Sequence, residues 1–189
     1  MNFYTSDTHF NHDAIRRYCS RIYGSVEEMN ESLIRNWNAI VKPEDTVYHL
    51  GDFGFGKVEQ LWRIRQRLHG NICLITGNHD RLVGDSAFDR MFGFVMPYYE
   101  QKIEDEEMDH RQTIVMCHYA FEVWNKRHFG SWHLHGHSHG TLHSPDYQAR
   151  LDVGVDSNGM APLSYDEVKH IMTKKAFKPL DHHTDRRKY

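Results

Sequence analysis

Five short clusters of Asp, Asn and His residues, most of them next to a glycine, stand out along the chain. In chain order they are Asp7-Thr8-His9, Gly51-Asp52, Gly77-Asn78-His79-Asp80, His118 and Gly136-His137-Ser138-His139. Asp and His side chains two positions apart at the end of a strand point to the same side, so both can reach one ion. Carboxylate and imidazole ligands together suit Mn, Fe, Zn or Ni. We therefore predict that the clusters form a site for divalent metal.

The alternative is that these histidines are ordinary surface residues. The chain has 16 histidines among 189 residues, and a solvated surface can carry many of them without a function. Their grouping with Asp, Asn and Gly in this order favours metal binding. Three widely spaced cysteines, Cys19, Cys73 and Cys117, form neither a CxxC pair nor a disulfide framework. A structural zinc knuckle is therefore not expected, and Cys73 and Cys117 lie in apolar runs typical of buried thiols.

The overall composition restricts the classes of partner. The formal net charge is −3, so no global positive field is available to hold nucleic acid, and stable nucleic-acid binding is not expected. A mean hydropathy of −0.72 and the absence of a long apolar run argue against a transmembrane helix. The first residues, MNFYTSDTHF, lack the basic flank and apolar stretch of a signal peptide. We expect no contact with a membrane and a cytoplasmic location.

The elements that must position the clusters are readable from hydrophobic periodicity. Strands are expected at 2–5, 46–50, 71–75, 98–103, 112–117, 131–134 and 150–155, and helices at 26–41, 58–68 and 164–172. Ser25 with Glu28 and Ser164 with Glu167 have the spacing of helix capping boxes. Strand-helix alternation followed by consecutive strands predicts an α/β fold with mixed sheets, in which each cluster follows a strand. Loops at strand ends are where such folds place their sites.

The length fits one ordinary domain. We expect this domain at residues 1–173 and a loosely held polar tail at 174–189, which contains His182 and His183 as surface residues. The acidic stretch 104–109 is expected to be a solvated turn between two strands of a hairpin.

Taken together, the clusters resemble the calcineurin-like metallophosphoesterase superfamily, whose pattern is DxH, GD, GNH[DE], H and GHxH. Every element of that pattern is present between Asp7 and His139. The opening TSDTHFNH and the short length resemble the small stand-alone bacterial and phage members. The resemblance implies a β-sandwich of two mixed sheets flanked by helices, in α/β/β/α layers.

The resemblance also implies a two-metal centre and a place for each ligand. Asp7, His9 and His139 would bind one divalent ion, Asn78, His118 and His137 would bind the other, and Asp52 would bridge them. The spacing of the residues alone does not decide which histidine serves which ion. A bridging carboxylate can hold two cations about 3.5–4 Å apart, which matches a phosphate ester.

Three further residues receive expected roles. Membership of the superfamily implies that His79 protonates the leaving oxygen or stabilises the transition state. Asp80 is expected either to orient His79 or to cap a helix, and His12 either to contact the substrate phosphate or to be a surface loop residue. Arg81 is expected to be an exposed residue at a helix start, with contact to phosphate as the alternative. The loop Phe53-Gly54-Phe55-Gly56 is expected to be packed, with a place on the pocket wall as the alternative.

The predicted function is a metal-dependent phosphoesterase, in first place a phosphodiesterase that acts on a small molecule or nucleotide. The alternatives are a phosphomonoesterase with the same site chemistry, a nuclease, which the acidic charge balance argues against, and a non-catalytic metal-binding scaffold. The presence of His79 and of all seven implied ligands argues against the scaffold.

Overall fold

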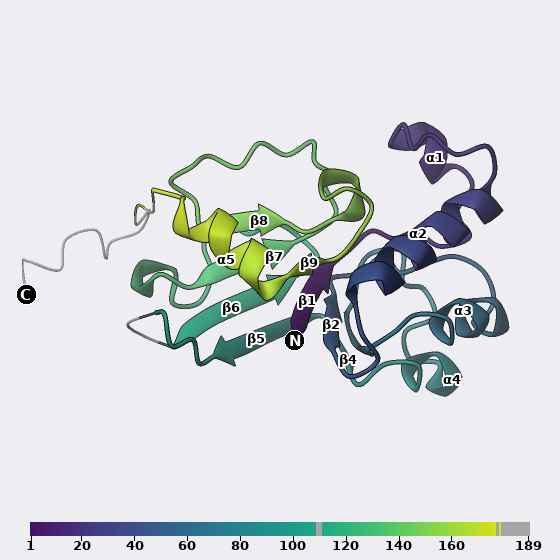
Figure 1. Ribbon diagram of the computed structural model, residues 1–189, viewed down its shortest axis with the longest axis horizontal. Coiled ribbons are helices and arrows are strands. Elements are labelled where there is room, and N and C mark those ends of the chain that lie inside the picture. The colour runs from purple at the N-terminus through teal and green to yellow at the C-terminus, as the bar shows by residue number, and fades with distance from the viewer. Residues whose placement is uncertain (109–110, 177, 179–189) are drawn as a thin grey trace, which may run out of the picture.

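The computed structural model describes residues 1–108, 111–176 and 178. Two mixed β-sheets and several helices make up an α/β fold (Figure 1). The first sheet has the strand order β4-β3-β2-β1-β9 and the second the order β5-β6-β7-β8. Residues 182 and 183, which the sequence places in a polar tail, and Asp109 of the acidic stretch lie outside the described residues.

The first sheet is built from the N-terminal half of the chain and closed by a late strand. Its strands are β1 (Asn2–Thr5), β2 (Thr46–His49), β3 (Asn71–Ile75), β4 (Val95–Met96) and β9 (Leu163–Ser164). Strands β1 to β4 run parallel, and β9 pairs antiparallel with β1. The two-residue strands β4 and β9 are too short for periodicity to reveal and were not predicted. The parallel arrangement brings the carboxyl ends of β1, β2 and β3 to one edge of the sheet.

The second sheet contains β5 (Tyr98–Ile103), β6 (Gln112–Cys117), β7 (Trp132–His135) and β8 (Arg150–Asp152). The predicted hairpin is confirmed, because β5 and β6 pair antiparallel, while β6, β7 and β8 run parallel. The strand expected to reach residue 155 ends at Asp152. There the Asp152 carboxylate accepts a hydrogen bond from the Gly154 amide, and a 3₁₀ turn follows at Val155–Ser157.

Helices form on the connections between strands. They are α1 (Ile15–Tyr18), α2 (Val26–Ile40), α3 (Val58–Arg65), α4 (Ser86–Asp89) and α5 (Tyr165–Thr173), with a 3₁₀ helix at Arg127–Phe129. The predicted capping box of α5 is complete, since Ser164 and Glu167 exchange hydrogen bonds. That of α2 is only half formed. Ser25 accepts from the Glu28 amide, but the Glu28 carboxylate accepts from Gly24 instead of Ser25.

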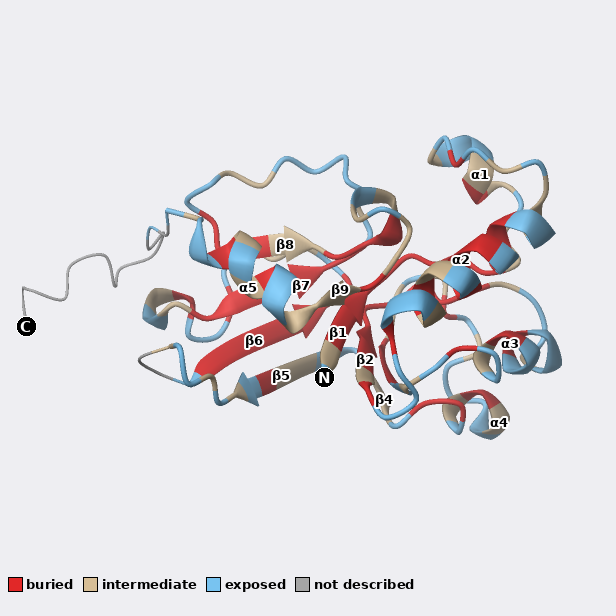
Figure 2. Ribbon diagram, in the orientation of Figure 1, coloured by how far each residue is buried: buried red, intermediate tan, exposed pale blue. Residues whose placement is uncertain are grey.

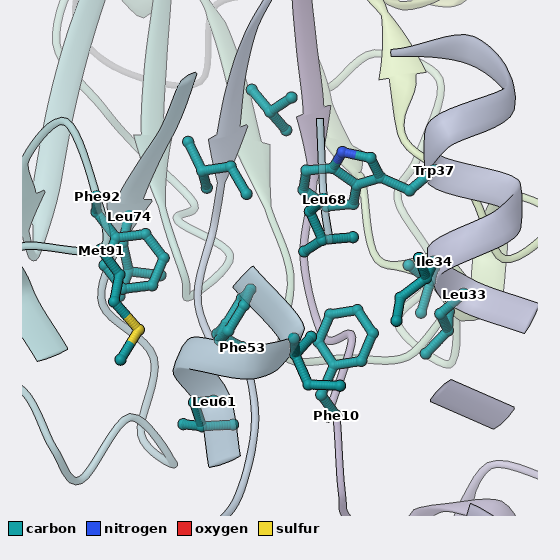
Figure 3. Close-up of a cluster of buried hydrophobic side chains, with 14 of the residues drawn as sticks. Phe10, Leu33, Ile34, Trp37, Phe53, Leu61, Leu68, Leu74, Met91 and Phe92 are labelled. Atoms are coloured by element: carbon teal, nitrogen blue, oxygen red, sulfur yellow. The ribbon is translucent and has the colours of Figure 1, made fainter. Parts of the chain in front are cut away.

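The alternation of side chains along β1 to β3 divides the interior into two clusters. One face, which includes Phe3, Val47 and Leu74, packs against α2 and α3. Figure 3 shows Leu74 beside Phe92, and Trp37 of α2 beside Leu68. The other face, which includes Tyr4, packs with the second sheet in a separate buried cluster. Helix α5 contributes to this second cluster. In Figure 2 the strands β1, β2, β6 and β7 are mostly buried, whereas β5 and β8 are partly exposed.

Candidate metal centre

The five clusters predicted from the sequence lie on loops that meet at one place. Asp7 and His9 follow β1, Asp52 follows β2, and Asn78 follows β3. From the second sheet, His118 follows β6, and the loop of His137 and His139 follows β7. The site is therefore formed where the carboxyl ends of parallel strands from both sheets come together.

Asp7, His9 and His139 form the first group of possible ligands. Asp7 Oδ1 lies 3.9 Å from His9 Nε2 and 3.8 Å from His139 Nε2. The ligand atoms of the three residues all lie within 4.8 Å of one another. Asp7 Oδ1 and His9 Nε2 are buried, and neither has a hydrogen-bond partner among the described residues. Buried polar atoms without a partner are costly, so a cation between these two atoms would satisfy both.

A second group is centred on the side-chain oxygen of Asn78. Asn78 Oδ1 lies 3.0 Å from His118 Nε2 and 3.0 Å from His137 Nδ1. The amide oxygen and the two ring nitrogens thus converge on a common point, as three ligands of one ion do.

Asp52 lies between the two groups. Its Oδ2 atom is 3.5 Å from His9 Nε2 in the first group and 3.6 Å from His118 Nε2 in the second. Its Oδ1 atom accepts a hydrogen bond of 2.8 Å from the His79 amide, which fixes the orientation of the carboxylate. One oxygen is therefore held and the other faces both groups, which is the arrangement a bridging ligand needs.

The far nitrogens of the histidines are held by hydrogen bonds. His118 Nδ1 donates to the Leu50 carbonyl at 2.7 Å, so in the neutral ring Nε2 carries the lone pair. His139 Nδ1 bonds to the Asp156 carboxylate at 2.6 Å, and His9 Nδ1 lies 3.2 Å from His12 Nδ1. In each of the three rings Nε2 is left to face Asp7 or Asp52. Such outer hydrogen bonds orient metal-binding imidazoles.

Burial shifts the pKa values of Asp7, His9 and His139, the first group of possible ligands. It raises the pKa of Asp7 to about 6, although the neighbouring His118 and His139 oppose this shift. It lowers the pKa of His9 far below the ordinary value, with further contributions from His139 and Arg21. Burial acts to lower the pKa of His139, but the hydrogen bond to Asp156 and the negative charges of Asp7 and Asp156 together outweigh it, so the net shift is upward. A neutral His9 is the form that can bind a metal ion.

The backbone of the site is in an unusual conformation. Asp7, His9, Asp52, His137 and His139 all have positive φ, between 46° and 68°. Such φ angles are uncommon outside glycine, and they cluster at functional sites where the surrounding structure imposes them. The sequence carries no signal of this strain.

The glycines of the clusters have two different roles. Gly51 has a φ of 95° and makes the tight turn that was expected. Gly77 and Gly136 lack a positive φ, and a Cβ atom on either would collide with the carboxylate of Asp52 or of Asp7 respectively. These two glycines are therefore required for close approach to the carboxylates and not for turning the chain.

His79 and Asp80 do not form the expected pair. The Asp80 carboxylate accepts hydrogen bonds from the amides of Asp52, Phe53 and Gly77, all between 2.8 and 2.9 Å. It therefore neither orients the His79 ring nor caps a helix, and instead ties the loop after β2 to the loop after β3. His79 Nδ1 is buried without a partner among the described residues, and its ring centroid lies 5.6 Å from that of His9.

His12 lies at the site and not on a remote surface loop. Its ring stacks on Phe55 with a centroid distance of 4.0 Å, and its Nδ1 atom contacts His9 as described above. Phe55 is thus part of the site. Both residues line the same cleft as His79, and so does Arg81, which is exposed as expected but lies in a turn.

Arg21 and Asp156 were missed by the sequence analysis. The Arg21 side chain is 1% exposed and makes two hydrogen bonds, of 2.7 and 2.8 Å, with Asp156. It also donates to the carbonyls of Asp7 and Thr8. Arg21 therefore supports the Asp7 loop directly and His139 through Asp156. Because 135 residues separate Arg21 from Asp156, no local pattern could reveal the pair.

A cleft of about 1040 Å³ lies over the site. His9, His79, His137 and His139 lie along it, and residues of the α1 segment and of the loops after β6 and β7 form its walls.

A separate finding concerns the membrane: no helix in residues 1–108, 111–176 and 178 combines the length and apolar character needed to cross a bilayer.

Comparison with known proteins identifies relatives that match most of the chain. The chain is 32% identical to the uncharacterized protein MJ1445 of Methanocaldococcus jannaschii over 177 residues, which cover 89% of each protein. It belongs to the same family as that archaeal protein. It is also 26% identical to the Gene 66 protein of Mycobacterium phage L5, over 89% of this chain and 94% of the phage protein. No established family profile matches the chain.

One solved structure shares the fold. It is a protein of unknown function, AQ665, from Aquifex aeolicus, with a TM-score of 0.64 and 24% sequence identity, and the match covers 90% of this chain and 98% of that one. This similarity concerns the fold alone. The chemistry must be argued from the site itself.

Proposed function

We propose that this chain is a dinuclear metal-dependent phosphoesterase of the calcineurin-like type, and that its preferred substrates are phosphodiesters. The observation that carries the proposal is the position of Asp52 Oδ2, 3.5 Å from His9 Nε2 and 3.6 Å from His118 Nε2. The donor set around it fits two borderline divalent cations such as Mn, Fe, Zn or Ni. The two mixed sheets with helices support the proposed sandwich fold.

The ligands divide as the geometry groups them. Asp7, His9 and His139 would hold one ion, and Asn78, His118 and His137 the other, with Asp52 shared. When bound, the two ions would polarise the phosphoryl oxygens and lower the pKa of a bridging water to supply hydroxide.

The remaining residues would position the ester and move its proton. His79 adjoins the site without completing either group, and its buried Nδ1 has no partner among the described residues. A proton from the His79 ring to the leaving oxygen would assist bond cleavage. His12, stacked on Phe55 beside His9, would contact a phosphate oxygen.

Charge favours a diester over a monoester. Two divalent ions, offset by Asp7, Asp52 and a hydroxide, carry a single net positive charge, which balances a singly charged diester. A doubly charged monoester would need further cations. Among the described residues that line the cleft, Arg81 is the one lysine or arginine. A nuclease or a non-catalytic scaffold is the weaker alternative: the lining has no basic stripe, and His79 and every proposed ligand lie at the site.

The test is a matrix of metals against substrates with the full chain. After chelation, the protein is reloaded separately with Mn, Fe, Zn or Ni, and bound metal is measured by elemental analysis. Turnover is then measured on linear diesters, cyclic nucleotides and monoesters that share a leaving group. Close to two ions per chain and fastest turnover of diesters are expected. Full activity with one ion would refute the bridged centre, and no turnover of any ester with two ions bound would favour the scaffold.

A further inference from the structure

The walls of the cleft contain several large apolar side chains, in contrast to its imidazole floor. Tyr18, Tyr119 and Leu142 are 75%, 46% and 42% exposed, yet all three line this one cleft. Large apolar side chains gathered around a polar centre are typical of a surface that binds a ligand.

The two tyrosines lie at different ends of the candidate metal centre. Tyr18 is an edge-on neighbour of His12, at a ring distance of 6.4 Å, and His12 in turn contacts His9 of the first ligand group. Tyr119 packs against His118 and His137 of the second group, with ring distances of 5.2 and 4.9 Å. An aromatic ring is thus available beside each group.

Size and charge restrict the ligand further. A volume of about 1040 Å³ is at the upper end of the range for small-molecule sites and exceeds what a phosphate with small alkyl groups requires. The single arginine on the lining, Arg81, provides no track for a long phosphate backbone. The ligand should therefore be compact, singly charged and rich in flat apolar surface.

We propose, on the basis of the phosphodiesterase function above, that the substrate is a linear diester with a flat ring on each side of its phosphate. Two nucleosides joined by one phosphate have this chemistry. Their bases would stack on Tyr18 and Tyr119, and the phosphate would lie over the imidazole floor. Stacking on an aromatic side chain tolerates any base, so these walls would select for the presence of two rings and not for their sequence.

The experiment uses the Mn²⁺-loaded full chain and two diesters with the same nitrophenolate leaving group and an alkyl ester on the other side. Thymidine 5′-(p-nitrophenyl) phosphate has a flat ring on both sides of its phosphate. Methyl p-nitrophenyl phosphate has a flat ring on one side only. We expect kcat/KM to be about five- to 150-fold higher for the thymidine ester, since this is the range of factors that stacking of one base contributes.

The variants Tyr18→Ala and Tyr119→Ala locate the two rings. Each variant should lower kcat/KM for the thymidine ester about tenfold. For the methyl ester, kcat/KM should fall only in the variant that lacks the tyrosine on which the nitrophenyl group stacks. Tyr147→Ala, a partly exposed tyrosine outside the cleft, is the matched control. Calorimetric binding of a dithymidine with a non-hydrolysable methylenephosphonate linkage should weaken in both variants, while metal content stays unchanged.

The outcomes separate this inference from the proposed function. Equal kcat/KM for the two esters in the wild type, or no effect of either tyrosine, would overturn the two-ring substrate and leave a phosphodiesterase. Tighter binding of a long single strand than of the dinucleotide analogue would also overturn it. Failure to hydrolyse either ester with two ions bound would overturn the proposed function itself.

Discussion

At the scale of single residues, the site depends on Asp52 more than on any other side chain. It is 2% exposed, one of its oxygens is fixed by the His79 amide, and the other faces both ligand groups. Ligand atoms of Asp7, Asp52 and His118 also lie within 4.8 Å of one another, but Asp52 is the carboxylate that we propose as the bridge. Asp52 should therefore couple the two metal positions, whereas Asn78 or His139 should affect one of them.

We predict that Asp52→Asn lowers metal content at both positions together and reduces turnover by several orders of magnitude. Removal of the shared negative charge leaves two cations that repel each other. Elemental analysis and turnover of the reloaded protein provide the measurement, with Asp166→Asn on the exposed face of α5 as control. Near-wild-type metal content in Asp52→Asn would show that Asp52 does not bridge.

A second prediction at this scale separates proton transfer from metal binding. We predict that His79→Ala and His79→Asn retain both ions but lose about 10²–10⁴-fold in turnover of esters with strongly basic leaving groups. The loss should shrink for nitrophenyl esters, whose leaving oxygen departs without a proton. A uniform loss would instead indicate stabilisation of phosphoryl charge, and loss of metal would make His79 a ligand. His170→Asn, on an exposed helix face, is the control.

At the scale of elements, the connection between β1 and α2 has two functions. It carries α1, whose Tyr18 lies on the wall of the cleft. It also contains Arg21, whose side chain is buried beside the site. Arg21 bonds to the carbonyls of Asp7 and Thr8 and to Asp156, whose Oδ2 atom is 2.6 Å from His139 Nδ1. The position of this connection and the orientation of His139, a proposed metal ligand, are thus held by one buried ion pair.

We predict that Asp156→Asn weakens binding at the first metal position about 10–100-fold and leaves the second nearly unchanged. Loss of an outer hydrogen bond to a ligating histidine has effects of that size. Arg21→Lys should have a similar but smaller effect, because lysine cannot reproduce the two-bond contact with a carboxylate. Competition with a chelator measures both affinities. Asp13→Asn, which removes an exposed contact with Arg16 on the same connection, is the control. Equal weakening of both positions in Asp156→Asn would indicate a general loss of structure.

At the scale of the whole molecule, several buried histidines outside the site must stay neutral for the fold to persist. His133 is fully buried, donates through Nδ1 to the Val115 carbonyl and accepts at Nε2 from the Phe121 amide. Burial lowers the pKa of His133 to about 3, and burial likewise lowers the pKa of His49 to about 3. In the unfolded chain both rings take up a proton near pH 6.5.

Since the folded pKa of these histidines lies below the unfolded value, the stability they contribute is present above pH 6.5 and is lost as the pH falls toward 3. We predict that the free energy of unfolding of the metal-free protein decreases steadily from pH 6.5 to pH 4. Burial raises the pKa of Asp7 to about 6. Considered by itself, Asp7 would therefore make the folded protein more stable as the pH falls from 6 to 4. The two neutral histidines should outweigh it.

Urea unfolding at a series of pH values measures this dependence. His133→Gln should be less stable than the wild type at pH 7, but its stability should depend less steeply on pH below 6.5. His170→Gln, at an exposed position, should keep the wild-type slope. An unchanged slope in His133→Gln would show that this ring is not neutral in the folded protein.

Sequence alone determined the residues of the candidate site and the elements that carry them. Helix α2, strands β1, β2 and β3 and the capping box of α5 were predicted nearly to their ends, because periodicity and capping depend on neighbours within a few residues. The order of the clusters along the chain also identified Asp7, Asp52 and His118 as candidates before any contact was known.

Tertiary structure alone decided how these residues meet and what supports them. The His137 amide bonds to Asp7 across 130 residues, and Arg21 bonds to Asp156 across 135. Asp80 was expected either to orient His79 or to cap a helix, and it does neither, because its carboxylate accepts hydrogen bonds from amides of a loop 27 and 28 residues away. The positive φ of Asp7, His9, Asp52, His137 and His139 was likewise found only in the structure. Such features depend on which distant loops converge, and a local pattern contains no record of that convergence.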